Sequence, residues 1–173
     1  EAWELNQKRS AVVLGGCCWL RLSPQRRIAQ AIDLSGLGLN RIEEERDVFR
    51  IGAMVTLGQL EAHEGLAVFT QGAMKEAVRH IVGTQFRNMA TVGGSISGRF
   101  GFSDIWTLFL ALDAQVELYK GGTVSLSAFG QTGPGRDIVT HIVVPKKACQ
   151  MAYDSLRLNE TDFPVIAVAV SAD

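Results

Sequence analysis

The sequence of 173 residues has no long apolar run, no marked excess of charge of either sign, and no Cys-x-x-Cys pair. A membrane helix needs about 20 consecutive apolar residues, so no transmembrane segment is predicted. The formal net charge of -1 argues against a protein that binds nucleic acid or an anionic membrane surface. No signal peptide is apparent, because Glu1 begins an amphipathic segment. With 47% hydrophobic and 20% charged residues, the composition is that of an ordinary globular protein.

Cysteine and histidine are scarce. Two of the three cysteines, Cys17 and Cys18, are adjacent, and the third is Cys149. Neighbouring cysteines rarely form a structural disulfide, so we predict reduced thiols and a cytoplasmic chain. The three histidines lie far apart in the sequence, and no metal site is predicted. Of these, His80 falls in a predicted helix, where a partly buried structural role is the simplest interpretation.

Glycine, in contrast, is used in pairs at three places. Gly15-Gly16 follows the apolar run Ala11–Leu14, and Gly93-Gly94 follows Ala90-Thr91-Val92. Paired glycines let the backbone approach a bulky group, and their amides can converge on an anion. We therefore predict two loops that hold one ligand, with two ordinary tight turns as the alternative. The third pair, Gly121-Gly122, separates two short strands and is assigned to a hairpin turn.

Hydrophobic periodicity predicts an α+β protein. The first half contains strands separated by short crossovers, as in a small α/β subdomain, and the second half is mostly antiparallel. A capping box from Thr56 to Gln59 opens a short helix, and Ser103 caps another. The last strand is apolar and has no closing element, so we expect a fragment or a strand that pairs outside the chain. The predicted strands are 10–14, 31–34, 48–52, 116–119, 123–126, 138–144, 150–156 and 165–170, and the longer helices are 69–81 and 104–112.

Several motifs together resemble the FAD-binding subunit or domain of the molybdenum hydroxylases, the family of xanthine dehydrogenase, aldehyde oxidase and the carbon monoxide dehydrogenase medium chain. The first is the glycine loop 13–19, and the second is the sequence Phe-Arg-Ile-Gly-Ala-Met-Val-Thr-Leu at 49–57. Residues 87–96 are similar to the family's Arg-Asn-x-Ala-Thr-x-Gly-Gly-Asn-Ile at nearly every position. Ser103-Asp104 and the Leu-Asp-Ala at 112–114 follow in the same order.

The resemblance implies a two-lobed FAD-binding fold of the PCMH type, which is similar to vanillyl-alcohol oxidase. A small α/β lobe would span 1–53 and a larger antiparallel-sheet lobe 54–147, and 148–173 would begin a truncated C-terminal domain. The two glycine loops would hold the FAD pyrophosphate, and Asp104 would accept hydrogen bonds from ribitol or ribose hydroxyls. The implied cofactor-binding residues are Val13, Leu14, Gly15, Gly16, Cys17, Cys18, Ile81, Thr91, Gly93, Gly94, Ser95, Asp104 and Val139.

The resemblance also implies an electron-transfer function. In the family, electrons from a molybdenum centre on a large subunit pass through 2Fe-2S clusters on a small subunit to FAD, and then to NAD or another acceptor. The protein would hold and tune the flavin, so no catalytic side chain is nominated. The expected partners are the molybdenum-cofactor subunit and the 2Fe-2S subunit, and possibly NAD.

Four departures from the family pattern bear on FAD binding. Cys17-Cys18 replaces Thr-Asp, and Ser95 replaces Asn. Arg99-Phe100-Gly101 replaces Ala-Ser-Pro, where Arg99 would compensate by meeting a phosphate, and Asp154 replaces a basic residue. A loss of about two hydrogen bonds, each worth ~1 kcal/mol, would weaken binding. Two alternatives stay open: a degenerate scaffold subunit without flavin, and a self-sufficient flavin oxidase.

Overall fold

The computed structural model describes residues 1–22, 28–147 and 150–172. Its helices are α1 (Ala2–Asn6), α2 (Leu57–Ala62), α3 (Glu64–Phe69), α4 (Ala73–Arg79), α5 (Thr84–Arg87), α6 (Val92–Gly98), α7 (Asp104–Ala111) and α8 (Leu126–Thr132), with 3-10 turns η1 (Leu20–Leu22) and η2 (Ser35–Leu37). Its strands are β1 (Ala11–Leu14), β2 (Gln30–Asp33), β3 (Ile42–Glu44), β4 (Val48–Gly52), β5 (Gln115–Leu118), β6 (Gly122–Ser125), β7 (Val139–Pro145), β8 (Gln150–Leu156) and β9 (Ile166–Ala172).

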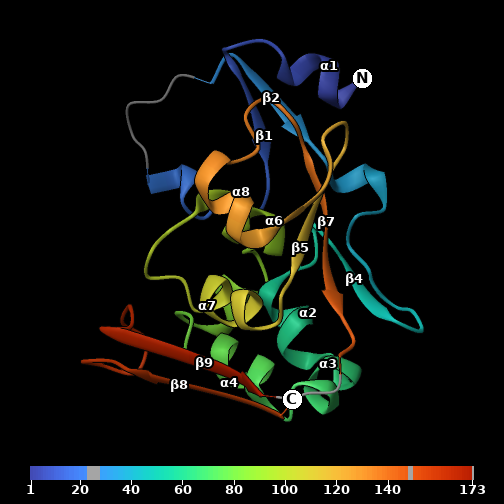
Figure 1. Ribbon diagram of the computed structural model, residues 1–173. Coiled ribbons are helices and arrows are strands. Elements are labelled where there is room, and N and C mark those ends of the chain that lie inside the picture. The colour runs from blue at the N-terminus through green and yellow to red at the C-terminus, as the bar shows by residue number, and fades with distance from the viewer. Residues whose placement is uncertain (23–27, 148–149, 173) are drawn as a thin grey trace.

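These elements form three layers along the molecule. Figure 1 shows α1, β1 and β2 at one end, the β8–β9 hairpin at the other, and most of the helices between them, beside the largest sheet. The fold is therefore a mixture of helices and mainly antiparallel strands, as the hydrophobic pattern predicts. Among the described residues, no helix has both the length and the apolar character that a membrane crossing requires.

The first lobe has a sheet of only two strands. β1 and β2 run parallel, with Val12 opposite Ala31 and Val13 opposite Ile32. Its small core contains Ile32 and Leu34, which are buried together with Ile138 from the segment just before β7. This lobe therefore packs directly against the start of a strand in the larger sheet.

The larger sheet has the strand order β3-β4-β7-β5-β6, and all its pairs are antiparallel. We expected strand 48–52 to join the first lobe, and this assignment is wrong, because β4 lies between β3 and β7. Phe49 and Ile51 of β4 are buried with Phe109 of α7 in the main core. Alternation along a strand shows which face is buried but does not identify the neighbouring strand, which is why the sequence suggested the nearer partner.

The predicted helix 69–81 is interrupted in the structure. α3 ends at Phe69, and α4 runs only from Ala73 to Arg79. Between them, Gln71 and Gly72 have φ values of 52° and 89°, which are left-handed and break the helical hydrogen bonding. The fourfold apolar spacing continues across the break because both helices pack against the same core. Gly83, two residues beyond the predicted helix, precedes α5.

Local capping signals were more reliable than periodicity. The Thr56–Gln59 capping box is present at the start of α2, and the Ser103 side chain caps α7. The hairpin around Gly121-Gly122 is confirmed as β5 and β6. However, β6 stops at Ser125, whose side chain accepts a hydrogen bond from the Ala128 amide and begins α8, a helix that was not predicted.

The β8–β9 hairpin has one covered and one exposed face. The strands pair along seven residues each, so the apolar last strand, for which no closing element was expected, has a partner within the chain. Met151 and Tyr153 of β8 are buried in the main core, and β9 contacts α7. On the other face, Ile166, Val168 and Val170 are at least half exposed. Cys149, just before β8, lies outside the described residues.

Candidate cofactor-binding site

The two glycine pairs meet at the junction between the lobes. Gly15 and Gly16 follow β1, while Gly93 and Gly94 lie in the first turn of α6, which the Thr91 side chain caps. A Cβ atom added to Gly15 would lie 2.8 Å from Thr91 Oγ1 and 3.6 Å from Gly94 Cα. A Cβ atom on Gly16 would lie 1.8 Å from the Met89 carbonyl oxygen. The prediction that the two pairs lie together is therefore confirmed, and the contact itself explains why glycine is needed in the first loop.

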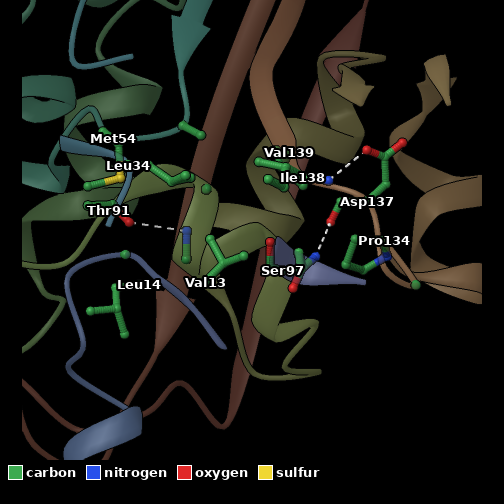
Figure 2. A pocket seen from close by; sticks show the side chains of 16 residues that line it. Val13, Leu14, Leu34, Met54, Thr91, Ser97, Pro134, Asp137, Ile138 and Val139 are labelled. Carbon is green, nitrogen blue, oxygen red and sulfur yellow. Dashed lines mark hydrogen bonds between the residues drawn. The ribbon is translucent and has the colours of Figure 1, made fainter. Parts of the chain in front are cut away.

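Two cavities open on either side of this contact. The smaller, about 210 Å³, is bounded by Leu34, Met54, Asp137 and Val139, among others (Figure 2). The larger, about 420 Å³, extends toward Asp104 and the loop before α7. Gly15, Thr91 and Gly94 line both cavities, so the glycine contact separates them.

All thirteen residues predicted from the resemblance line one or both cavities. Those on the larger cavity are Val13, Gly15, Gly16, Cys17, Cys18, Ile81, Thr91, Gly94, Ser95 and Asp104. Those on the smaller cavity are Val13, Leu14, Gly15, Thr91, Gly93, Gly94 and Val139. They come from β1 and the loop after it, from α6 and its cap, from α7 and β7, and from the segment after α4, so the fold brings together residues that are far apart in the sequence. Their contact with a cofactor stays a prediction.

The two loops differ in how their backbone amides are used. In the second loop, the Gly93 amide donates to the Ala53 carbonyl (2.9 Å), and the Gly94 amide donates to Thr91 Oγ1 (3.2 Å). In the first loop, the amides of Gly16 and Cys17 have no acceptor within the described part of the chain. The first loop therefore offers free donors to an anion, whereas the second mainly offers a close approach to its backbone.

Asp104 is a buried carboxylate with two partners. It is 5% exposed, at the start of α7. Its Oδ1 atom accepts hydrogen bonds from the Tyr153 hydroxyl and the Arg157 guanidinium. Burial, followed by the hydrogen bond to Asp104, raises the pKa of Tyr153 well above its ordinary value, so this phenol keeps its proton and stays a donor. The resemblance predicted Asp104 as a cofactor-binding residue, but its burial and its pairing with Tyr153 of β8 and with Arg157 just after β8 were not visible in the sequence.

The adjacent cysteines are free thiols on the wall of the larger cavity. Cys17 has a left-handed φ of 58°, and its thiol donates to the Gly15 carbonyl at 3.3 Å. Burial raises the pKa of the Cys18 thiol, which therefore stays protonated at neutral pH. The loop thus carries two thiols as weak donors, and they close the turn on itself.

Sequence reasoning missed a group of four aromatic rings, which we call the aromatic cluster: Trp19, Phe100, Phe102 and Phe163. The ring centroids of Trp19 and Phe100 are 4.7 Å apart, and those of Phe102 and Phe163 are 4.3 Å apart. All four line the larger cavity. They come from three separate loops with no common periodicity, so only the tertiary fold could reveal them.

Comparison with known proteins identifies the family. The profile described as "FAD binding domain in molybdopterin dehydrogenase" matches residues 1–147. This chain belongs to that family. FAD is therefore the cofactor of this FAD-binding domain.

Three proteins illustrate the similarity. The uncharacterized protein YgfM of Escherichia coli K12 is 29% identical over 176 residues, which cover 99% of this chain and 65% of YgfM. The nicotine 6-hydroxylase medium subunit of Paenarthrobacter nicotinovorans is 27% identical over 93% of this chain and 60% of its own length. A chain of the reconstituted CO dehydrogenase from Oligotropha carboxidovorans superposes with a TM-score of 0.85 at 26% identity, covering 98% of this chain and 65% of that chain. This chain thus spans 60–65% of the length of these proteins.

The cavities of this FAD-binding domain fit the cofactor. Pockets for ligands of this kind usually measure about 300–1,000 Å³, and the two cavities together fall in this range. Free amides at Gly16 and Cys17 suit a pyrophosphate, and the glycine contact allows the chain to approach it closely. In the described residues, no group of three or more His, Cys, Asp or Glu side chains is placed to hold a metal ion.

Two residues that seemed relevant to FAD lie elsewhere. The expectation that Arg99 meets a phosphate is not supported, because its guanidinium donates to the Gly130 carbonyl at 3.2 Å, beside Gly133. Asp154 is exposed on β8 and accepts from the Ser155 amide. The basic side chain near Asp104 is Arg157, three residues further on.

Proposed function

We propose that this FAD-binding domain is the electron-transfer part of a molybdenum hydroxylase complex, in which it holds FAD across the junction of its two cavities. The observation that carries the proposal is the contact between Gly15 and Gly94, with cavities on both sides. The pyrophosphate would lie at this contact, near the Gly16 and Cys17 amides. The flavin ring would enter the larger, mostly apolar cavity, and the adenosine would enter the smaller one.

The flavin supplies the redox chemistry when bound, and the protein supplies position and environment. Asp104 would accept a hydrogen bond from a ribitol hydroxyl through its Oδ2 atom, since Arg157 and Tyr153 already bond its Oδ1. Ile81 and Val139 would contact the cofactor from opposite cavities. No side chain of this chain needs to act as an acid or a base.

The proposed partners are a molybdenum-cofactor large subunit and a 2Fe-2S small subunit, with NAD or another molecule as the final acceptor. Support comes from the relatives, one of which is named as the medium subunit of nicotine 6-hydroxylase and another as a CO dehydrogenase. Electrons would arrive from the 2Fe-2S clusters, reduce FAD, and leave to the acceptor. Co-purification of the native complex, followed by metal and flavin analysis, tests this assignment.

The direct test is reconstitution of the purified chain with FAD, measured by absorbance. We expect flavin bands at close to one FAD per chain. Gly94→Val should abolish them, because Gly94 lines both cavities and a larger side chain would occupy the position of the pyrophosphate. The matched control is Gly36→Val, since a Cβ atom there meets nothing within 4 Å. Full flavin occupancy in Gly94→Val, with a far-ultraviolet circular dichroism spectrum like that of the wild type, would contradict the proposal.

A second candidate is a scaffold subunit that keeps the fold but binds FAD poorly. The observation in its favour is that the Gly93 and Gly94 amides already donate within the chain, and that thiols replace stronger hydrogen-bonding groups in the first loop. The same reconstitution separates the two candidates. Absence of flavin bands at saturating FAD, from a folded chain, would favour the scaffold.

A further inference from the structure

The aromatic cluster is exposed in a way that is unusual for four rings in contact. Phe163 is 56% exposed, Trp19 39% and Phe102 36%. The rings are not random neighbours: Phe100 and Phe102 stack with an interplanar angle of 16°, and Trp19 and Phe163 with one of 20°. Contiguous exposed apolar surface on a folded protein usually marks a place where something binds.

The position of the cluster shows what kind of ligand it suits. Its four rings line the larger cavity, whose inner wall is also apolar and includes Leu57, Ile81, Phe86 and Ile105. Polar groups lie at other points of the same cavity, namely the first glycine loop and Asp104. A ligand that matches this arrangement has a planar aromatic ring at one end and a polar chain leading to an anion at the other.

We propose that the aromatic cluster is the stacking site for the isoalloxazine ring of the flavin. The inference rests on the proposed function and names the residues that recognise the ring. Aromatic faces attract one another in offset or tilted geometry, and stacking on a base or a similar ring contributes substantially to affinity. Because the first loop carries weak thiol donors, this stacking surface would supply a large part of the binding.

Arg157 acts as a positioning residue for the cluster. Its Nη1 atom donates to the Asp162 carbonyl at 2.6 Å, and Phe163 is the next residue in the chain. Its Nη2 atom pairs with Asp104 on α7. The guanidinium therefore connects the β8–β9 turn to the wall of the cavity, and it fixes the backbone next to Phe163, which lines that cavity. The Arg157 side chain is only 7% exposed, so this connection is fixed from within the protein.

The experiment compares three ligands on the full chain: FAD, riboflavin, which has the ring without the pyrophosphate, and ADP-ribose, which has the pyrophosphate without the flavin ring. The variants are Trp19→Leu and Phe163→Leu. The control is Tyr119→Leu, an exposed aromatic residue outside both cavities. Dissociation constants come from fluorescence titration for the flavins and from calorimetry for ADP-ribose.

We expect each cluster variant to bind FAD and riboflavin about tenfold more weakly than the wild type, and to bind ADP-ribose with unchanged affinity. The control variant should bind all three ligands as the wild type does. Unchanged riboflavin affinity in both variants would overturn the proposal. Weaker binding of ADP-ribose by the cluster variants, with unchanged binding of riboflavin, would also overturn the proposal, because the cluster would then contact adenine. If the wild type binds riboflavin in a Trp19-dependent way but not FAD, the stacking site stands and the proposed function fails. If neither flavin binds, both are overturned.

The role of Arg157 is tested by a double-mutant cycle in riboflavin affinity. Arg157→Lys keeps the charge near Asp104 but cannot contact Asp104 and the Asp162 carbonyl in the same fork geometry. We expect Arg157→Lys to lower the affinity for riboflavin severalfold in the wild-type background. In the Phe163→Leu background it should have little further effect, since both changes act on the same ring. Full additivity of the two effects would show that Arg157 does not act through Phe163. An equal melting temperature of Arg157→Lys and wild type would exclude a merely structural loss.

Discussion

The contact between the two glycine loops can be tested in solution through Gly15 and Thr91. A methyl group on Gly15 would lie 2.8 Å from Thr91 Oγ1, closer than real Cβ atoms come to a neighbour, so Gly15→Ala forces a shift. Overpacking of this kind costs about 1–3 kcal/mol of unfolding free energy. Thr91→Ala alone removes the cap of α6, for which the Gly94 amide is the donor, at a cost of about 1 kcal/mol.

The double variant tests whether the cost of Gly15→Ala comes from direct contact with the Thr91 side chain. Thr91→Ala removes the very atom that the new methyl group meets, so Gly15→Ala should then cost almost nothing. The loss in the double variant should therefore be smaller than the sum of the two single losses by about 1–3 kcal/mol, the cost of Gly15→Ala alone. Gly16→Ala offers the contrast, because its Cβ atom would meet backbone atoms of Met89 and Ala90 that no side-chain change can remove. The assay is urea unfolding followed by circular dichroism. Strictly additive losses in the double variant would refute the direct contact between the loops.

Three further predictions concern buried polar groups. Thr70→Val should lower the unfolding free energy by about 1–3 kcal/mol in urea titrations, because the fully buried hydroxyl links the end of α3 to the start of α4. The raised pKa of Tyr153 makes the folded chain retain a proton that the unfolded chain releases above about pH 10, so stability should fall as the pH rises past this value, and less steeply in Tyr153→Phe. Burial and the nearby charge of Arg50 lower the pKa of His141. Stability should therefore fall as the pH drops below about 6.5, and His141→Gln should show a weaker decline in thermal melts across that range.

The parts of the fold that could be predicted are those encoded locally. The Thr56 capping box, the Ser103 cap and the Gly121-Gly122 turn each depend on side chains within a few residues, and all three are present. The parts that could not be predicted depend on contacts with segments that are far away in the sequence. Strand 48–52 was recognised as a strand, but its position between β3 and β7 is set by packing that its own sequence does not record.

The same distinction applies to the site. The glycine pairs could be predicted to meet because each carries a recognisable loop pattern, and Gly15 does lie against Gly94. The surroundings of Asp104 could not, because Arg157, which bonds it, follows β8 and lies more than fifty residues further along the chain. The aromatic cluster follows from loop conformations that no periodicity describes, so only the tertiary structure brings Trp19 beside Phe163.

The central strands of the larger sheet have a consequence for how a cofactor would leave. β4 leads into Ala53, whose carbonyl accepts the Gly93 amide, and β7 begins at Val139 on the smaller cavity. Both strands have a neighbour on each side, so their amides should exchange with solvent only on unfolding of the whole sheet. The base of the site is therefore as rigid as the sheet itself. Entry and release of a cofactor would be governed by the loops at the rim, around Trp19 and Phe163, whose opening leaves the sheet intact.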